Sequence, residues 1–324
     1  MLRLIPDNTK IGFMAARKFC YGLSILGIVA SIALFFSVGL NYGIDFEGGL
    51  AVEIGTTNDS AIDIGHVRGS LSDLGLGDVS VQEYGRPSEA LIRVERQPGD
   101  DAAQKAALDL VRATLEKTVP DVSFRQENVI GPKVSGELKR DGIIAISVAL
   151  AAVLIYIWFR FEWQFGLGAV IALFHDVILT IGFFAITQLE FNLSVIAALL
   201  TIVGYSLNDT VVVYDRIREN IRKFRKMEVP ELIDFSLNQT LSRTTMTSFT
   251  TLLALLGLYI FGGEVIRGFT AAMIWGIFVG TYSSIFVASP LLTLMKLDRE
   301  HMFNDVQDND PTVDKSRSVD PFAN

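Results

Sequence analysis

Six long runs of apolar, almost uncharged residues limit this chain to one broad class of fold. They cover 19–44, 142–159, 163–189, 191–214, 244–263 and 268–295. Each approaches or exceeds the roughly 20 residues that a helix needs to cross about 30 Å of hydrocarbon. With 50% hydrophobic residues and a mean hydropathy of +0.39, the chain is too apolar for a soluble protein of this length. The sequence therefore predicts a multi-span α-helical membrane protein with six transmembrane helices.

The first run begins like a signal peptide, because Arg17 and Lys18 precede it. It is too long for the apolar region of such a peptide, and no A-x-A cleavage site follows it. We therefore expect a retained span at 19–40 after a cytoplasmic N-terminus at 1–18. The single cysteine, Cys20, lies in this run, so the sequence allows no disulfide within the chain.

The positions of Lys and Arg in short connections predict the orientation. Basic residues concentrate before the first span and in the segment 215–243, and six spans place both on one side, which is the cytoplasmic one. We expect the last five spans within 139–297, with 215–243 as a basic cytoplasmic loop. The polar, acidic segment 298–324 is expected to be a disordered cytoplasmic tail.

The hydrophilic segment 41–138 lies on the opposite side and has the pattern of a small folded domain. The periodicity predicts a strand at 50–54, a helix at 64–74 after a Ser60-x-x-Asp63 capping box, strands at 79–85 and 90–96, a helix from Asp100 or Asp101 to Pro120, and a strand from Asp121. The order β-α-β-β-α-β is typical of a ferredoxin-like α+β domain.

This segment carries no pattern of an enzyme. It has no His/Cys cluster, Gly-rich phosphate loop or nucleophile elbow, and its lone His66 is expected at the surface. We predict a binding or lever domain, no metal and no other cofactor. The net charge of -8 lies mainly here and in the tail, and no nucleic-acid partner is predicted.

The fourth run carries a carboxylate inside its apolar part. A polar stripe at helical spacing is formed by Thr201, Tyr205, Asn208 and Asp209. Asp209 precedes Arg216 by seven residues, about 10 Å along a helix axis, and so lies below the interface. A charge at the centre of a spanning helix costs roughly 2.5–3.5 kcal/mol and usually faces a bundle interior or a water-filled path. The stripe favours such a path.

A second polar stripe lies in the fifth run, at Thr240, Arg243, Thr247 and Thr251. If it faces the fourth helix, Arg243 keeps Asp209 ionised, and withdrawal of Arg243 lets Asp209 bind a proton. The two residues therefore suggest a proton switch. The alternative is a static ion pair at the cytoplasmic rim, with Arg243 extended toward water.

The third run contains His175 and Asp176 side by side. Neighbouring helix positions diverge by about 100°, so both cannot face the same path. A structural or assembly role is favoured for His175, whereas Asp176 stays open between such a role and the path.

Five motifs in order resemble the SecD/SecF family of bacterial protein-export membrane proteins, in particular its SecF members. They are NYGIDFEGG at 41–49, VIGPKVSGEL at 129–138, FHDVILTIG at 174–182, GYSLNDTVVVYDRIREN at 204–220 and NQTLSRTTMTS at 238–248. The resemblance implies a six-span half of a transporter of the resistance-nodulation-division superfamily, with a periplasmic domain between the first two spans. A small departure is Tyr214, where Phe is expected.

The resemblance also implies a function in the bacterial cytoplasmic (inner) membrane. There, SecD and its SecF partner use the proton-motive force to assist Sec-dependent protein translocation. The implied partners are SecD, the Sec translocation channel with its accessory subunits, the translocating unfolded polypeptide and protons. The implied proton relay combines Asp209, Arg243 and Thr247 with an Asp that SecD supplies.

Three other functions compete with this one. An exporter of lipids or drugs from the same superfamily would share the spans and the relay, but it normally carries twelve spans and two external domains in one chain. An intramembrane aspartyl protease would need Asp176 and Asp209 close enough to share a proton, and its GxGD motif is replaced by SLND at 206–209. A purely structural partner of SecD is the third.

Overall fold

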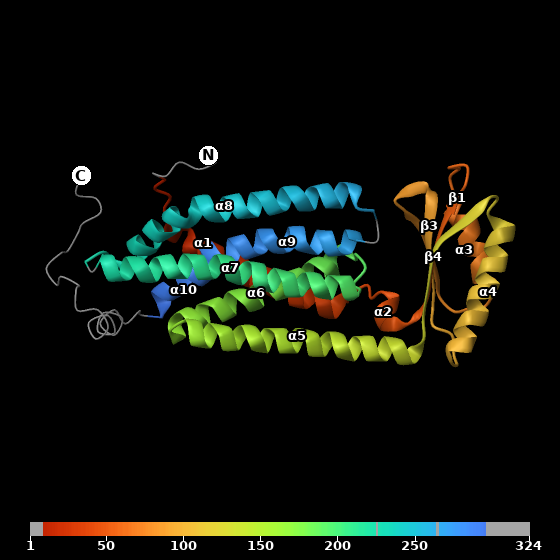
Figure 1. Cartoon of the computed structure of the whole chain (residues 1–324), viewed down its shortest axis with the longest axis horizontal. Helices are drawn as coiled ribbons and strands as arrows, with labels where there is room; N and C mark the ends of the chain where they lie inside the picture. The colour runs from red at the N-terminus through yellow and green to blue at the C-terminus, as the bar shows by residue number, and fades with distance from the viewer. Residues whose placement is uncertain (1–8, 225, 264–265, 296–324) are drawn as a thin grey trace.

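The computed structural model describes residues 9–224, 226–263 and 266–295, which form a bundle of long helices with a small sheet domain at one end (Figure 1). The long helices are α1 (Phe13–Ser37), α5 (Pro132–Arg160), α6 (Trp163–Thr187), α7 (Leu193–Lys223), α8 (Val229–Phe261) and α9 (Arg267–Ser283). The last continues through a π-helical segment, η2 (Ser284–Ala288), into α10 (Ser289–Leu294). Within the described residues, six helical stretches are long and apolar enough to cross a membrane, so the six-span prediction is confirmed.

The helix ends differ from those that the apolar runs suggest. The first helix covers Phe13–Ser37 instead of 19–40. Within the described residues, the segment 215–243, predicted as a loop, is helical at 215–223 and 229–243, because α7 and α8 continue past their apolar parts. Hydropathy marks where a helix meets lipid, and it does not mark where the helix stops. The tail at 298–324 and residues 1–8 lie outside the described residues.

The ends of α7 and α8 continue as helices because they pair with each other. The amide of Asn220, 1% exposed, donates to Ser236 Oγ at 2.8 Å and to Gln239 Oε1 at 2.9 Å. A buried amide is costly unless it is hydrogen-bonded, so this contact fixes the register of the two antiparallel helices.

The sheet domain has the predicted element order. It contains β1 (Gly49–Thr56), α3 (Ile64–Ser72), β2 (Val79–Tyr84), β3 (Arg86–Val94), α4 (Asp101–Thr118) and β4 (Val122–Ile130). The strands form one antiparallel sheet in the order β2-β3-β1-β4, and α3 and α4 cover one of its faces. This arrangement is consistent with the ferredoxin-like prediction.

Helix caps in this domain are close to the prediction, with one correction. Asp63 itself caps α3, since its carboxylate accepts from the backbone N–H of His66, so the predicted cap at Ser60 is wrong. Asp100 caps α4 in the same way through the N–H of Ala102. His66 is exposed, as predicted.

Polar contacts attach the sheet domain to the end of the bundle. Between them lies the short helix α2 (Ile44–Glu47), whose Asp45 accepts from the backbone N–H of Leu193 at 3.0 Å. Arg93 of β3 forms an ion pair with Glu190 in the connection between α6 and α7. Burial raises the pKa of Glu190, and the Arg93 guanidinium opposes that rise. The domain is therefore fixed directly over the helix ends.

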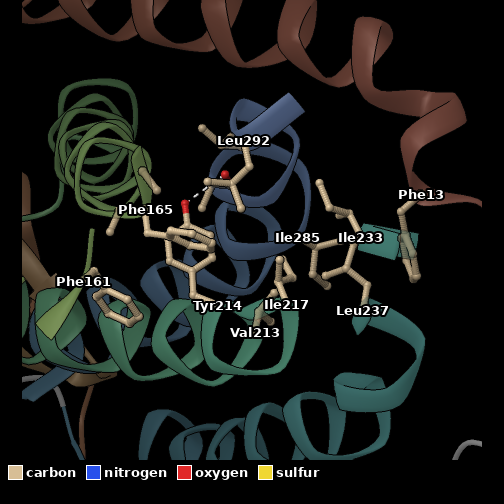
Figure 2. Close-up of a cluster of buried hydrophobic side chains, with 14 of the residues drawn as sticks. Phe13, Phe161, Phe165, Val213, Tyr214, Ile217, Ile233, Leu237, Ile285 and Leu292 are labelled. Atoms are coloured by element: carbon tan, nitrogen blue, oxygen red, sulfur yellow. Dashed lines mark hydrogen bonds between the residues drawn. The ribbon is translucent and has the colours of Figure 1, made fainter. Parts of the chain in front are cut away.

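The core at the other end of the bundle is built around Tyr214 (Figure 2). Its ring is fully buried, with ring centroids 5.1 Å from Phe165 and 5.8 Å from Phe161. The hydroxyl donates to the carbonyl oxygen of Ala288 at 2.9 Å, at the end of η2. A Phe here would leave that carbonyl without this donor, so the departure at Tyr214 has a structural reason.

Helices α7 and α9 pack closely because glycines face α7. A Cβ at Gly276 would overlap the side chain of Ile202, which is 1% exposed. By contrast, a Cβ at Gly257 of α8 would meet nothing within 4 Å.

We therefore expect Gly276→Leu to destabilise the bundle, by about 1–3 kcal/mol, as overpacking of a filled core does. The measurement is the thermal unfolding midpoint of the purified protein in detergent. Gly257→Leu is the matched control and should leave the midpoint unchanged. Equal midpoints for the two variants would contradict the close packing of α7 on α9.

Candidate functional site

Two carboxylates are buried within the helical bundle, in different surroundings. Asp176 of α6 is 0% exposed and Asp209 of α7 is 2% exposed. Asp209 lies six residues, about 9 Å, from Asp215, which forms an ion pair with Arg160 at one end of the bundle. Asp209 therefore lies about two turns further into the bundle than this ion pair.

Both oxygens of Asp176 are occupied by hydrogen-bond donors. Ser206 of α7 and Ser283 of α9 both donate to Oδ2, the latter at 2.7 Å. His175 Nδ1 lies 2.8 Å from Oδ1. A carboxylate with all three partners buried binds helices together, because each broken bond would leave a buried polar group unpaired. The position of Asp176 thus indicates a structural centre that joins α6, α7 and α9.

Besides its contact with Asp176, His175 packs against α9 and lines a cavity. Its ring stacks on Tyr282 of α9, with centroids 6.0 Å apart, and it lines a cavity of about 610 Å³ between α1, α6 and α9. Its Nε2 is buried and has no hydrogen-bond partner within the described residues. Both neighbours therefore contact α9, His175 through Tyr282 and Asp176 through Ser283, and the direct contact between them was not anticipated.

Asp209 has the opposite character. Its Oδ2 is buried, and within the described residues its carboxylate makes no hydrogen bond or ion pair. Arg243 of α8 acts on it electrostatically, but within the described residues no ion pair joins the guanidinium and the carboxylate. A desolvated carboxylate with no donor is costly when ionised, and binding a proton would remove that cost.

The facing part of α8 carries hydroxyl groups at the level of Asp209. Asp209 lies eleven residues before Asn220 on α7, and Thr247 lies eleven residues after Ser236, the partner of Asn220, on α8. Because the helices are antiparallel, this equal spacing places Thr247 and Asp209 at the same level along the bundle axis. Thr247 Oγ1 donates to the backbone oxygen of Thr244 at 2.9 Å.

Two further polar atoms on these helices are buried and have no hydrogen-bond partner in the part of the chain that the structure describes. They are Tyr205 Oη on α7 and Thr244 Oγ1 on α8. Sequence reasoning placed Tyr205 on the stripe but missed Thr244, and it also missed Ser206 and Ser283 at Asp176. The available signal was the presence of hydroxyl residues at buried helix positions, but small hydroxyl residues are common wherever spanning helices pack.

Both polar stripes, on α7 and on α8, continue onto the surface of the bundle. Thr201, Asn208 and Arg243 are exposed, next to the buried Asp209. Within residues 9–224, 226–263 and 266–295, no group of three or more His, Cys, Asp or Glu could hold a metal ion. The arrangement suits proton binding and release at a carboxylate, with a nearby cation and hydroxyls.

Comparison with known families gives two matches. The family described as "Protein export membrane protein SecD/SecF, C-terminal" matches residues 110–298, and the "SecD/SecF GG Motif" matches residues 33–59. The second match covers the stretch that connects α1 to β1.

Individual relatives agree with the family matches. The chain is 44% identical over 319 residues to the protein translocase subunit SecF of Rhodobacter capsulatus, covering 95% of each chain. It is 46% identical over 292 residues to the protein translocase subunit SecDF of Brucella abortus, covering 90% of this chain and 38% of that one.

Among solved structures, SecDF of Thermus thermophilus, a translocon-associated membrane protein, is similar with a TM-score of 0.80 and 37% identity. The match covers 90% of this chain and 40% of that chain, so the present chain spans less than half of the solved protein. On these matches, the chain belongs to the SecD/SecF family of protein-export membrane proteins, as a SecF-type translocase subunit.

Proposed function

We propose that this chain is the SecF half of a proton-driven SecD–SecF complex in the bacterial inner membrane, with Asp209 as its proton-binding group. Both termini and the α7–α8 connection face the cytoplasm, and the sheet domain faces the periplasm. Proton flow past Asp209 assists translocation of an unfolded polypeptide that the Sec channel and its accessory subunits deliver. Each proton that crosses 100 mV releases about 2.3 kcal/mol for this work.

The observation that carries the proposal is the unpartnered carboxylate of Asp209 beside Arg243. A static ion pair, the competing interpretation, would bring carboxylate and guanidinium within hydrogen-bond distance. They are apart, so Asp209 can take up a proton without breaking a hydrogen bond within the described chain. Approach of Arg243 then favours the ionised form, and its withdrawal favours the protonated form. Thr247 completes the relay as a neighbouring hydroxyl.

The partner is inferred from the exposed parts of the two polar stripes. Thr201, Asn208 and Arg243 are unsuitable neighbours for lipid tails, because polar side chains in spans almost always face protein or a water-filled cavity. A second helical bundle that covers α7 and α8 would remove this exposure. Relatives named SecDF, in which a chain like this one spans about 40% of the length, support SecD as that bundle.

The protease alternative conflicts with the surroundings of Asp176. Its two oxygens are held by His175, Ser206 and Ser283, and within the described residues no hydrogen bond joins it to Asp209. A dyad requires two carboxylates that share one proton. The geometry instead separates a structural carboxylate from a proton-binding one. A lipid or drug exporter receives no support from the relatives, which are named as translocase subunits.

The first test is replacement of Asp209 by Asn. Export of a model secretory protein is measured in inverted membrane vesicles that contain SecD, at saturating ATP, with and without a proton gradient. We expect Asp209→Asn to reduce the gradient-dependent stimulation to the level seen without a gradient, because Asn cannot bind and release the proton.

The matched control is Asp215→Asn on the same helix. Asp215 is 40% exposed and pairs with Arg160 at the end of the bundle, so its loss should leave the stimulation intact. Unchanged stimulation in Asp209→Asn, with the complex assembled in normal amount, would reject Asp209 as the coupled proton site and favour the purely structural partner.

A second test separates the two buried carboxylates by stability. Asp176→Asn weakens charge-assisted hydrogen bonds worth about 1.5–3 kcal/mol each, and we expect the unfolding midpoint in detergent to fall by about 5 °C. Asp209→Asn removes a carboxylate without a donor, so its midpoint should stay the same or rise. A larger fall for Asp209→Asn than for Asp176→Asn would show that the roles are reversed.

A further inference from the structure

A groove of about 240 Å³ lies between α5 and the rest of the bundle. Its wall on the bundle side is apolar and consists of Val177, Ile181, Ile196, Leu199, Leu200 and Val203. Helix α5 packs loosely here, with only 11% of its most apolar stretch buried. Figure 1 shows α5 running along the outside of the bundle for its whole length.

The side of the groove that α5 supplies is a single stripe. It consists of Lys139, Ile143, Ile146 and Leu150, at steps of four, three and four residues, which is one face of a helix. The stripe spans eleven residues, about 16 Å along the axis. One leaflet of a bilayer has about 15 Å of hydrocarbon, half of the full thickness. The groove thus matches the length of a lipid tail in the leaflet next to the sheet domain.

The outer mouth of the groove carries a cation. Lys139 is exposed, and within the described residues it forms no ion pair. Its Nζ lies 5.5 Å from the ring centroid of Tyr42, which lines the same mouth. This contact holds the ammonium over the groove. The ring carries no net charge, so the contact does not neutralise the ammonium. The groove is apolar and about as long as a lipid tail, and an ammonium lies at its mouth. These features are complementary to a lipid with an apolar tail and an anionic headgroup.

We propose that this groove binds one anionic phospholipid of the leaflet next to the sheet domain. An acyl chain lies between α5, α6 and α7, and the headgroup phosphate lies against Lys139. The site is separate from the polar face of α7 and α8, so it does not depend on the proton relay.

The test is native mass spectrometry of the purified full chain after incubation with vesicles of equal parts phosphatidylglycerol and phosphatidylcholine. The wild-type protein should retain phosphatidylglycerol in preference. Lys139→Gln should reduce the ratio of bound phosphatidylglycerol to phosphatidylcholine about fivefold, which corresponds to about 1 kcal/mol for one Lys at a membrane surface. Lys133→Gln is the control, because Lys133 lies on the same helix and does not line the groove.

A second pair of variants tests the groove itself. Ile146→Trp fills it and should remove most of the retained lipid, whereas Ile144→Trp, whose side chain lies outside the groove, should retain it. The proposal is overturned if the wild type shows no preference, if Lys139→Gln keeps the wild-type ratio, or if Ile146→Trp carries as much lipid as Ile144→Trp. A dimer that Ile146→Trp abolishes would assign the groove to a second copy of the chain.

Discussion

The hydrogen bonds around Asp176 hold the centre of the bundle together. In a bilayer no water replaces a lost donor, so a carboxylate in the middle of a helix needs partners from its neighbours. Ser206 and Ser283 provide them from α7 and α9. The glycines of α9 allow the close approach that these short side chains need, since a Cβ at Gly280 would lie 3.0 Å from Ser206. Small residues and the central carboxylate therefore form one packing arrangement.

The same arrangement determines how Asp209 is presented. Asp209 lies one helical turn beyond Ser206, so the element that carries it is anchored through Asp176. An anchored helix keeps the carboxylate at a fixed depth. Arg243 of α8 lies on the exposed side of the bundle near this carboxylate. The proposed proton site therefore combines a fixed acid with a cation that is not bonded to it. Such a pair can respond to movement of α8 without rearrangement of the core.

Much of this could be predicted from the sequence, for identifiable reasons. Hydropathy located all six spans, and period-two and helical patterns gave the element order of the sheet domain, because both reflect burial. The length of α7 and α8 could not be predicted in this way. Their ends are paired by the contact of Asn220 with Ser236, which lies outside the apolar runs. The polar stripe with Asp209 was visible as spacing. The partners of Asp176 come from three helices, and a single sequence does not show which serines face it.

Helices α5 and α8 are both sparsely buried along their apolar parts, but the surfaces beside them differ in polarity. The exposed face around α8 includes Arg243 and Asn208, whereas the groove beside α5 is apolar up to the single ammonium of Lys139. Lipid tails tolerate the second surface and not the first. A bundle built as one half of a larger assembly needs this asymmetry, because one side must meet protein while the other must meet the bilayer. The residues of the proposed relay lie on the polar side, and in the proposed complex a protein partner covers that side and shields it from lipid.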